Sequence, residues 1–282
     1  MTDKPNAIFL TVKDYTVSQQ TFELHYDEQY DMLATFPKPS AADLPKYYES
    51  EDYISHSDKK TGIFSMMYQI VRNTTLKSKV NIIEQYQPSK GSLLDIGAGT
   101  GHFGAIALKN NWQVTGIEPN QGARKSATEK GITFAEQIQD LESNTFDVIT
   151  MWHVLEHVPE LNEQIAQLKR VLKPNGTLII AVPNFKSFDA KYYKEFWAAF
   201  DVPRHLWHFS KTAISKLFQQ QNMNVVEILP MKWDAFYVSL LSEKYKTGKM
   251  NFLRAFFIGL QSNFKAKHNF EYSSHIYVIK NN

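Results

Sequence analysis

No cysteine occurs among the 282 residues of the chain. This absence excludes disulfide bonds, thiolate metal sites, iron–sulfur clusters and every mechanism that needs a cysteine nucleophile. A chain without thiols fits a reducing compartment, and we expect a cytoplasmic protein.

Long hydrophobic runs are also missing. The longest apolar stretch lies near residues 252–260 and is interrupted by Arg254, whereas a spanning helix needs roughly 20 apolar residues. At the N-terminus Asp3 stands where a signal peptide carries positive charge, and the apolar run 8–10 is too short for one. We therefore expect neither a transmembrane segment nor a signal peptide.

The chain has little excess charge of either sign, because 31 basic and 29 acidic residues leave a net charge of +2. The distribution is uneven: residues 1–90 carry −2, residues 91–182 carry −3 and residues 183–282 carry +7. The last third is either a solvated surface or a basic face for an anionic partner. Within it, the aromatic and basic segment 233–266 could recognise phosphate, carboxylate or a membrane surface.

The first part of the chain predicts short strands. Residues 8–12, 21–26 and 32–36 are rich in β-formers, and the pair flanking Asp27–Tyr30 is typical of a hairpin. We assign residues 1–60 to an N-terminal hairpin and lid extension. The periodicity of residues 63–86 then predicts a long helix.

From Ser92 onward apolar strands alternate with helical patterns. Alternating βα units predict an α/β fold with a parallel sheet covered by helices on both faces, and ligands then bind at the carboxyl ends of the strands. We assign residues 61–282 to this domain, with a cofactor-binding half at 91–182 and an acceptor-side half at 183–282. The predicted strands are 92–96, 113–117, 132–134, 146–151, 177–182, 225–229 and 275–280, and the predicted helices are 102–110, 121–130, 161–172, 211–221 and much of 233–266.

A glycine loop follows the first of these strands. Gly97, Gly99 and Gly101 stand between an apolar strand and a helical pattern, where glycine lets the backbone approach a ligand at the helix N-terminus. The third glycine falls one residue early for the dinucleotide fingerprint, and no P-loop motif is present. Glu118 ends the next strand, 19 residues after Gly99. A carboxylate at that distance is typical of a group that accepts hydrogen bonds from a ribose diol.

These segments together resemble a known family. The run Leu93–Gly101, then Glu118, then 146–157 and 172–178 resembles the class I S-adenosylmethionine-dependent methyltransferases over roughly residues 80–230. Asp201–His205 with Phe209 is similar to the small-molecule branch related to ubiquinone-biosynthesis enzymes. The resemblance implies a Rossmann-like, doubly wound, mostly parallel seven-stranded sheet. Many relatives bind zinc through a C-x-x-C hairpin near the N-terminus, and this chain has no cysteine for such a site.

The resemblance also implies the residues that hold S-adenosylmethionine. The glycine loop would hold the methionine part of the cofactor, and Glu118 would hold the ribose. Residues after the third strand would flank the adenine, and residues after the fourth strand would line the rest of the cofactor. Glu136 or Gln137 would lie beside the adenine. The cofactor-binding set is Asp95, Gly97, Ala98, Gly99, Gly101, Glu118, Pro119, Glu136, Met151 and Trp152.

His153–His157 reads H-x-x-E-H, which is also the inverted zinc-protease signature. The motif directly follows a buried strand and Pro159 comes two residues after it, so we expect no metal there. His153 and His157 are then either catalytic or structural.

On the acceptor side, methyl transfer from a sulfonium relies on positioning, and a base can activate an oxygen or nitrogen nucleophile. His153, His205 and His208 are candidate bases, and we place His208 also among acceptor-binding residues. Arg204 could hold an anionic acceptor, unless Asp201 ties this segment into a structural turn. Tyr53, with the neighbouring Tyr47, Tyr48 and His56, would form a lid over the site.

We therefore expect a methyltransferase that acts on a small-molecule or glycan-type acceptor, which could be anionic; the oligomeric state is not predicted. Cytosine C5 methylation is excluded by the missing cysteine. Three alternatives remain: a nucleic-acid methyltransferase using the basic last third, although no recognisable nucleic-acid module is present, a nicotinamide oxidoreductase, and a non-catalytic cofactor-binding scaffold.

Overall fold

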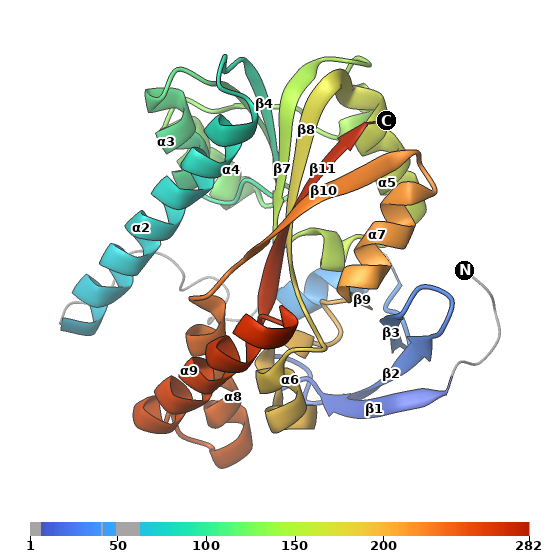
Figure 1. Ribbon diagram of the computed structural model, residues 1–282, viewed down its shortest axis with the longest axis vertical. Coiled ribbons are helices and arrows are strands. Elements are labelled where there is room, and N and C mark those ends of the chain that lie inside the picture. Colours follow the sequence, from blue (N-terminus) through green and yellow to red (C-terminus); the bar gives the residue numbers. More distant parts are fainter. Residues whose placement is uncertain (1–6, 41, 49–62, 282) are drawn as a thin grey trace.

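The computed structural model describes residues 7–40, 42–48 and 63–281, and for residues 63–73 the backbone alone. Two sheets organise the chain (Figure 1). The strands are β1 Ile8–Lys13, β2 Thr21–Asp27, β3 Met32–Phe36, β4 Ser92–Ile96, β5 Gln113–Ile117, β6 Thr133–Phe134, β7 Phe146–Trp152, β8 Leu172–Pro183, β9 Trp207–His208, β10 Met223–Pro230 and β11 Ser274–Asn281.

The helices lie between these strands in the order that the alternating pattern predicts. The α-helices are α2 Ile63–Tyr86, α3 His102–Lys109, α4 Gln121–Thr128, α5 Leu161–Val171, α6 Phe188–Tyr193, α7 Lys211–Gln219, α8 Asp234–Thr247 and α9 Phe252–Asn269. The short 3-10 helices are η1 Leu44–Tyr48, η2 Ile138–Asp140, η3 Leu155–His157, η4 Lys194–Phe196 and η5 Ala198–Phe200. Among these described helices, none is both long enough and apolar enough to cross a membrane.

The central sheet has seven strands in the order β10-β11-β8-β7-β4-β5-β6. β6, β5, β4, β7 and β8 run parallel to one another, whereas β11 is antiparallel to both β8 and β10. The α/β, mostly parallel fold class is thereby confirmed. The strand order reverses between β4 and β7, so the crevice for a ligand is expected at the carboxyl ends of these two strands.

Helices cover both faces of this sheet (Figure 1). One core joins α5 and α7 to the sheet through residues such as Leu168 and Leu217, and a second joins α2 and α3 through Val80 and Phe103. The central strands are buried on both sides, which explains why their sequences are apolar runs without alternation.

The N-terminal hairpin is confirmed, because β2 and β3 pair antiparallel with Tyr26 opposite Leu33. β1 and β9 complete a second, four-stranded sheet. β9 comes from residues 207–208, so this sheet combines the N-terminal extension with the acceptor-side half. The division into domains at residue 60 stays a prediction.

Two local features go beyond the predicted elements. Residues 174–176, between the predicted helix 161–172 and the predicted strand 177–182, lie inside β8, where β7 advances from Phe146 to Val148 while β8 advances from Leu172 to Thr177, so the extra residues form a bulge. Segment 233–266 contains two helices, because Gly248 ends α8 at φ 76° and the Asn251 side chain caps α9.

Candidate cofactor and acceptor site

The glycine loop occupies the crevice between β4 and α3. Gly97, Gly99 and Gly101 all have positive φ, at 73°, 53° and 77°. A Cβ on Gly97 would lie 2.4 Å from Val154, and one on Gly101 would lie 2.6 Å from Ala127, so both glycines are required by packing. A Cβ on Gly99 would meet no atom within 4 Å. Gly99 therefore borders open space that a ligand can enter.

Glu118 lies beside this loop as the spacing predicts. Its Oε2 accepts a hydrogen bond from the Gly99 N–H at 2.8 Å, and its Oε1 accepts one from the Asn120 N–H at 2.9 Å. Each carboxylate oxygen can accept a second hydrogen bond. The two oxygens are thus held in fixed positions with free acceptor sites, which suits a ligand with two adjacent hydroxyl groups.

Asp95 is buried behind the loop and interacts electrostatically with the half-buried Lys79. Asp95 is 2% exposed and accepts a hydrogen bond from the Thr150 hydroxyl at 2.7 Å. Burial raises the pKa of Asp95 to about 7, although Thr150 and Lys79 oppose the rise. Burial lowers the pKa of Lys79 to about 8 despite the nearby Asp95 and Asp234. Sequence reasoning missed Lys79, because one lysine on a helix before the first strand carries no motif.

Trp152, at the end of β7, faces the same region. The Lys79 ammonium lies 4.3 Å from the centre of its ring, and the Phe103 ring meets it edge-on. Its buried Nε1 has no hydrogen-bond partner within the described residues, so a donor is left for a ligand. Met151, by contrast, is fully buried in the core of the sheet.

His153 turns the chain away from β7 with φ 58°. Its Nε2 lies 3.1 Å from Asp234 at the start of α8, and its Nδ1 lies 3.4 Å from Glu156. Burial alone would lower the pKa of His153, but the two carboxylates outweigh it and raise the pKa to about 9. His153 is therefore protonated near neutral pH, which disfavours it as a base.

His157 and His205 lie beside Glu156, and these three residues are called the histidine group below. The His157 Nδ1 lies 3.0 Å from the Arg204 carbonyl and 3.1 Å from the Tyr48 hydroxyl, and the His205 Nδ1 lies 2.9 Å from the Ala199 carbonyl. A ring nitrogen facing a carbonyl must donate, so Nε2 is the acceptor when the ring is neutral. The His205 Nε2 lies 3.8 Å from the Asp201 carboxylate. The two rings meet edge-on, with their centres 4.5 Å apart. Burial, together with His205, lowers the pKa of His157 to about 4, so this ring is neutral.

Glu156, His157 and His205 also meet a geometric condition for a metal site. Each offers one ligand atom, and these atoms lie within 4.8 Å of one another. The pKa of Glu156 lies below its ordinary value: burial would raise it, but His153 and the other two histidines outweigh that effect. The carboxylate is thus charged and already faces the protonated His153.

Residues 68–228, more than half of the chain, match the family model described as "Methyltransferase domain". The chain belongs to this methyltransferase-domain family.

Two curated relatives are ubiquinone biosynthesis O-methyltransferases. The one from Pasteurella multocida is 38% identical over 111 residues, which cover 33% of this chain and 46% of the relative. The one from Coxiella burnetii is 31% identical over 125 residues, which cover 41% and 53%. This family member thus spans about half the length of the curated relatives it matches.

Solved structures of the family show the same fold. Magnesium protoporphyrin IX methyltransferase from Synechocystis matches with a TM-score of 0.56 at 14% identity, over 84% of this chain and 97% of that one. Phosphoethanolamine N-methyltransferase 2 from Haemonchus contortus matches with a TM-score of 0.55 at 14% identity, over 97% and 71%. At such identities the likeness establishes the fold alone.

The other residues predicted for the cofactor site differ in their contacts with the glycine loop. Ala98 donates its N–H to the Ile117 carbonyl, next to Glu118, and Pro119 is the exposed residue that follows Glu118. Glu136 is exposed and forms a two-pronged ion pair with Arg124 on α4. Its role beside adenine stays a prediction. Tyr53 and His56 lie outside the described residues.

Arg204 and His208 are both buried. The Arg204 guanidinium pairs with Asp201 and donates to the Tyr47 carbonyl at 2.8 Å. The pKa of Asp201 falls to about 2, because Arg204 outweighs the effect of burial. His208 contacts the Thr35 hydroxyl at 3.0 Å. These contacts favour the structural-turn alternative for Arg204 over the anchoring of an acceptor.

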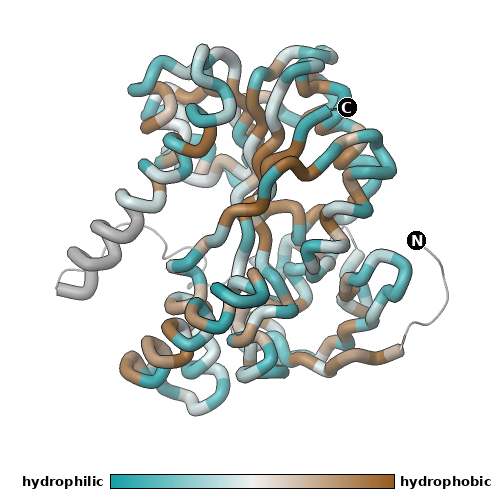
Figure 2. Tube along the Cα trace, in the orientation of Figure 1, coloured by the Kyte–Doolittle hydropathy of each residue, from teal (hydrophilic) through white to brown (hydrophobic). Residues whose placement is uncertain are grey.

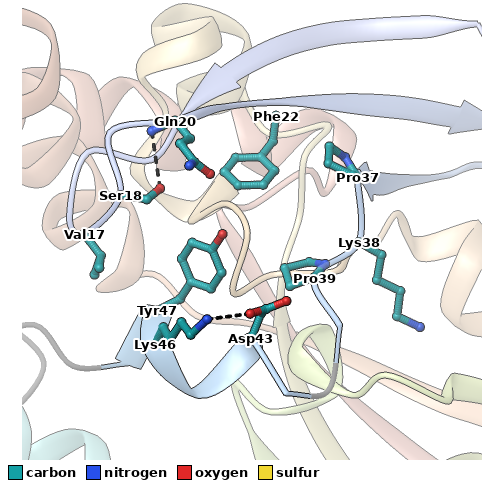
Figure 3. Close-up of a pocket in the computed structure, with 10 residues that line it drawn as sticks. All are labelled: Val17, Ser18, Gln20, Phe22, Pro37, Lys38, Pro39, Asp43, Lys46 and Tyr47. Carbon is teal, nitrogen blue, oxygen red and sulfur yellow. Dashed lines mark hydrogen bonds and ion pairs between the residues drawn. The ribbon is translucent and has the colours of Figure 1, made fainter.

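A cavity of about 380 Å³ lies in the N-terminal extension (Figure 3). Phe22 and Tyr47 face into it, and Lys46 pairs with Asp43 at its edge. The cavity contains no residue of the glycine loop. One lining residue, Tyr47, accepts a hydrogen bond from Arg204 through its carbonyl, and the Arg204 carbonyl in turn contacts His157.

The pair His153–Asp234 predicts a pH dependence of stability. The pKa of His153 is raised in the folded chain, so its contribution is complete below about pH 6.5 and is lost as the pH rises through about 9. We expect the thermal midpoint of the wild type to fall faster between these values than that of Asp234→Asn. Thermal unfolding from pH 6 to 10 measures this, and parallel curves for the two proteins would contradict the assignment.

The histidine group also leads to a prediction about metal. We expect chelating agents to leave methyl transfer unchanged, because a sulfonium methyl is electrophilic without a Lewis acid and because His153 already balances the charge of Glu156. Metal analysis of the purified protein and assays after treatment with EDTA provide the check. One zinc ion per chain, together with loss of activity on its removal, would revive the metal reading of H-x-x-E-H.

Proposed function

We propose that the protein is an S-adenosylmethionine-dependent methyltransferase that acts on a small-molecule acceptor. The observation that carries this proposal is the pairing of the open Gly99 backbone with the fixed Glu118 carboxylate. When bound, S-adenosylmethionine supplies a sulfonium methyl group for an in-line displacement. The membership of the methyltransferase-domain family supports this choice over a nicotinamide oxidoreductase.

On the cofactor side, this chain's residues bind and orient. Glu118 would accept hydrogen bonds from the two ribose hydroxyls, and the N–H groups at the start of α3 would hold the methionine part. Lys79 and Trp152 offer a cation and an unpaired N–H donor to the carboxylate of the methionine part. One oxygen of the Asp95 carboxylate accepts a hydrogen bond from Thr150, so the other oxygen is left to accept one from the cofactor.

On the acceptor side, His205 and His157 are the residues that would take up a proton from the acceptor. A neutral imidazole with an open Nε2 can take the proton of a hydroxyl group as the nucleophile attacks. Glu156 lies next to both rings and stabilises the imidazolium that results. Tyr48 holds His157 from the side of the N-terminal extension. Buried walls around this group exclude water, which strengthens these interactions.

We propose a hydroxyl group on a small molecule as the acceptor. The names of the curated relatives, which are O-methyltransferases, support this choice, as does the position of the His157 and His205 rings beside Glu156. The cavity next to Tyr47 offers a volume within the usual range for small-molecule sites. An anionic group on the acceptor would have to compete with Asp43 for Lys46 and with the Pro159 carbonyl for Lys38.

Transfer of labelled methyl groups tests this function directly. The protein is incubated with methyl-labelled S-adenosylmethionine and extracts of small metabolites, and Glu118→Ala serves as the control that lacks the ribose contact. Label in low-mass products from the wild type alone is the expected result. Label in nucleic acid would support the nucleic-acid alternative, and cofactor binding without any transfer would indicate a scaffold.

A further inference from the structure

Helix α9 buries mostly small side chains and exposes large apolar ones. Its buried face consists of Ala255, Ile258, Gly259, Ser262 and Ala266. Its outer face carries Leu253, Phe256, Phe257, Leu260 and Phe264, which are between 49% and 75% exposed. These five residues follow helical spacing and form one continuous stripe, which we call the α9 outer face. Ordinary surface helices show the opposite pattern.

The packing of α9 on α8 explains the small inner residues. A Cβ on Gly259 would lie 2.7 Å from the Phe236 ring and 3.0 Å from its Cα, so the two helices approach closely. α8 likewise buries Ala235, Ser239 and Ser242 against its neighbours. The large side chains of α9 are therefore not needed for this contact. In Figures 1 and 2 the two helices form the end of the molecule opposite α3 and α4.

Charge around the α9 outer face is of one sign. Residues 231–270, all of which the structure describes, contain seven basic and two acidic residues. Glu243 is fully buried and pairs with Arg254 at 3.4 Å, and Asp234 is paired with His153. The exposed charges are consequently the cations Lys232, Lys246, Lys249, Arg254, Lys265 and Lys267.

From this combination we propose that the α9 outer face docks on an anionic lipid bilayer. A helix that exposes aromatic and leucine side chains between lysines suits the boundary between headgroups and acyl chains, where cations meet anionic lipids. An isologous dimer would place this cationic surface against its own copy, so like charges would repel. Single-stranded nucleic acid would match the cations and the aromatic rings, but Leu253 and Leu260 offer no stacking surface.

Docking in this orientation has a consequence for the site. α8 begins at Asp234, which binds His153 after β7. The bilayer-binding end is thus one helix away from the proposed reaction centre. The inference concerns a surface outside that centre and does not depend on the proposed reaction.

Co-sedimentation of the full chain with vesicles tests the proposal. One set of vesicles contains phosphatidylcholine alone, and the other also contains phosphatidylglycerol. We expect the chain to bind the second set, and high salt to weaken this binding. The double variant Leu253→Ser/Phe257→Ser should have an at least tenfold lower partition coefficient. Burial of each large apolar side chain in the bilayer should raise the partition coefficient about tenfold or more. Val226→Ser, which alters an exposed apolar residue on edge strand β10, is the matched control and should bind like the wild type.

Each other outcome would overturn the proposal. Absence of binding to both vesicle sets, or equal binding by the double variant, would show that the α9 outer face does not recognise a bilayer. A dimer in sedimentation analysis that the double variant disrupts would assign the face to a second copy. Loss of oligonucleotide binding in that variant would assign it to nucleic acid. Unchanged thermal unfolding and S-adenosylhomocysteine affinity establish that the double variant is folded.

Discussion

Replacement of Glu118 by alanine is expected to weaken the binding of S-adenosylhomocysteine by about 1.5–3 kcal/mol, a factor of roughly 10 to 150. The variant loses the two acceptors proposed for the ribose hydroxyls. It also releases the Gly99 N–H, whose hydrogen bond to Glu118 holds the loop in place. Isothermal titration calorimetry measures the change, with thermal unfolding as the check that the variant is folded.

Glu136→Ala is the matched control for this experiment. Glu136 is exposed and pairs with Arg124, so its removal costs one surface ion pair and should change the affinity little. Unchanged affinity in folded Glu118→Ala would rule out the ribose assignment. A large loss in Glu136→Ala would instead support the predicted position of Glu136 beside the adenine.

Replacement of His205 by glutamine is expected to lower turnover by about 10²–10⁴-fold, the usual effect of removing a general base. Its affinity for S-adenosylhomocysteine should stay unchanged, because His205 makes no contact with the glycine loop. The ring is fixed by the Ala199 carbonyl, its Nε2 lies 3.8 Å from Asp201, and the His157 ring meets it edge-on. Single-turnover rates across a range of pH, with cofactor binding measured separately, provide the test.

Two further variants separate the possible roles around His205. Wild-type turnover in His205→Gln would remove this residue as the base, and a loss confined to His157→Gln would transfer the role to His157. Arg204→Ala should reduce thermal stability, because its guanidinium joins Asp201 to the Tyr47 carbonyl. An intact fold with a raised KM for the acceptor would restore Arg204 as an anionic anchor.

The cofactor side was predictable because its residues are local in the sequence. The strand, the glycine loop and Glu118 lie within 27 residues, and adjacent parallel strands bring their carboxyl ends together. The positive φ values at Gly97, Gly99 and Gly101 follow from the same motif. The apolar runs also fixed the seven strands closely, because strands buried on both faces carry no other pattern.

The acceptor side was less predictable because its contacts are long-range. His157 and His205 are 48 residues apart in the chain, and their rings meet through the turn tied by Arg204 and Asp201. Nothing in the local sequence indicates that His153 is paired with Asp234, which lies 81 residues later. The short strand at 207–208 likewise depends on β3 for its partner.

Calorimetric titration of the purified protein with S-adenosylhomocysteine and with NAD tests the central claim most directly. The glycine loop and Glu118 predict one S-adenosylhomocysteine bound per chain, with no measurable heat from NAD at the same concentrations. Binding of NAD in preference to S-adenosylhomocysteine, or binding of neither by the folded protein, would contradict the account.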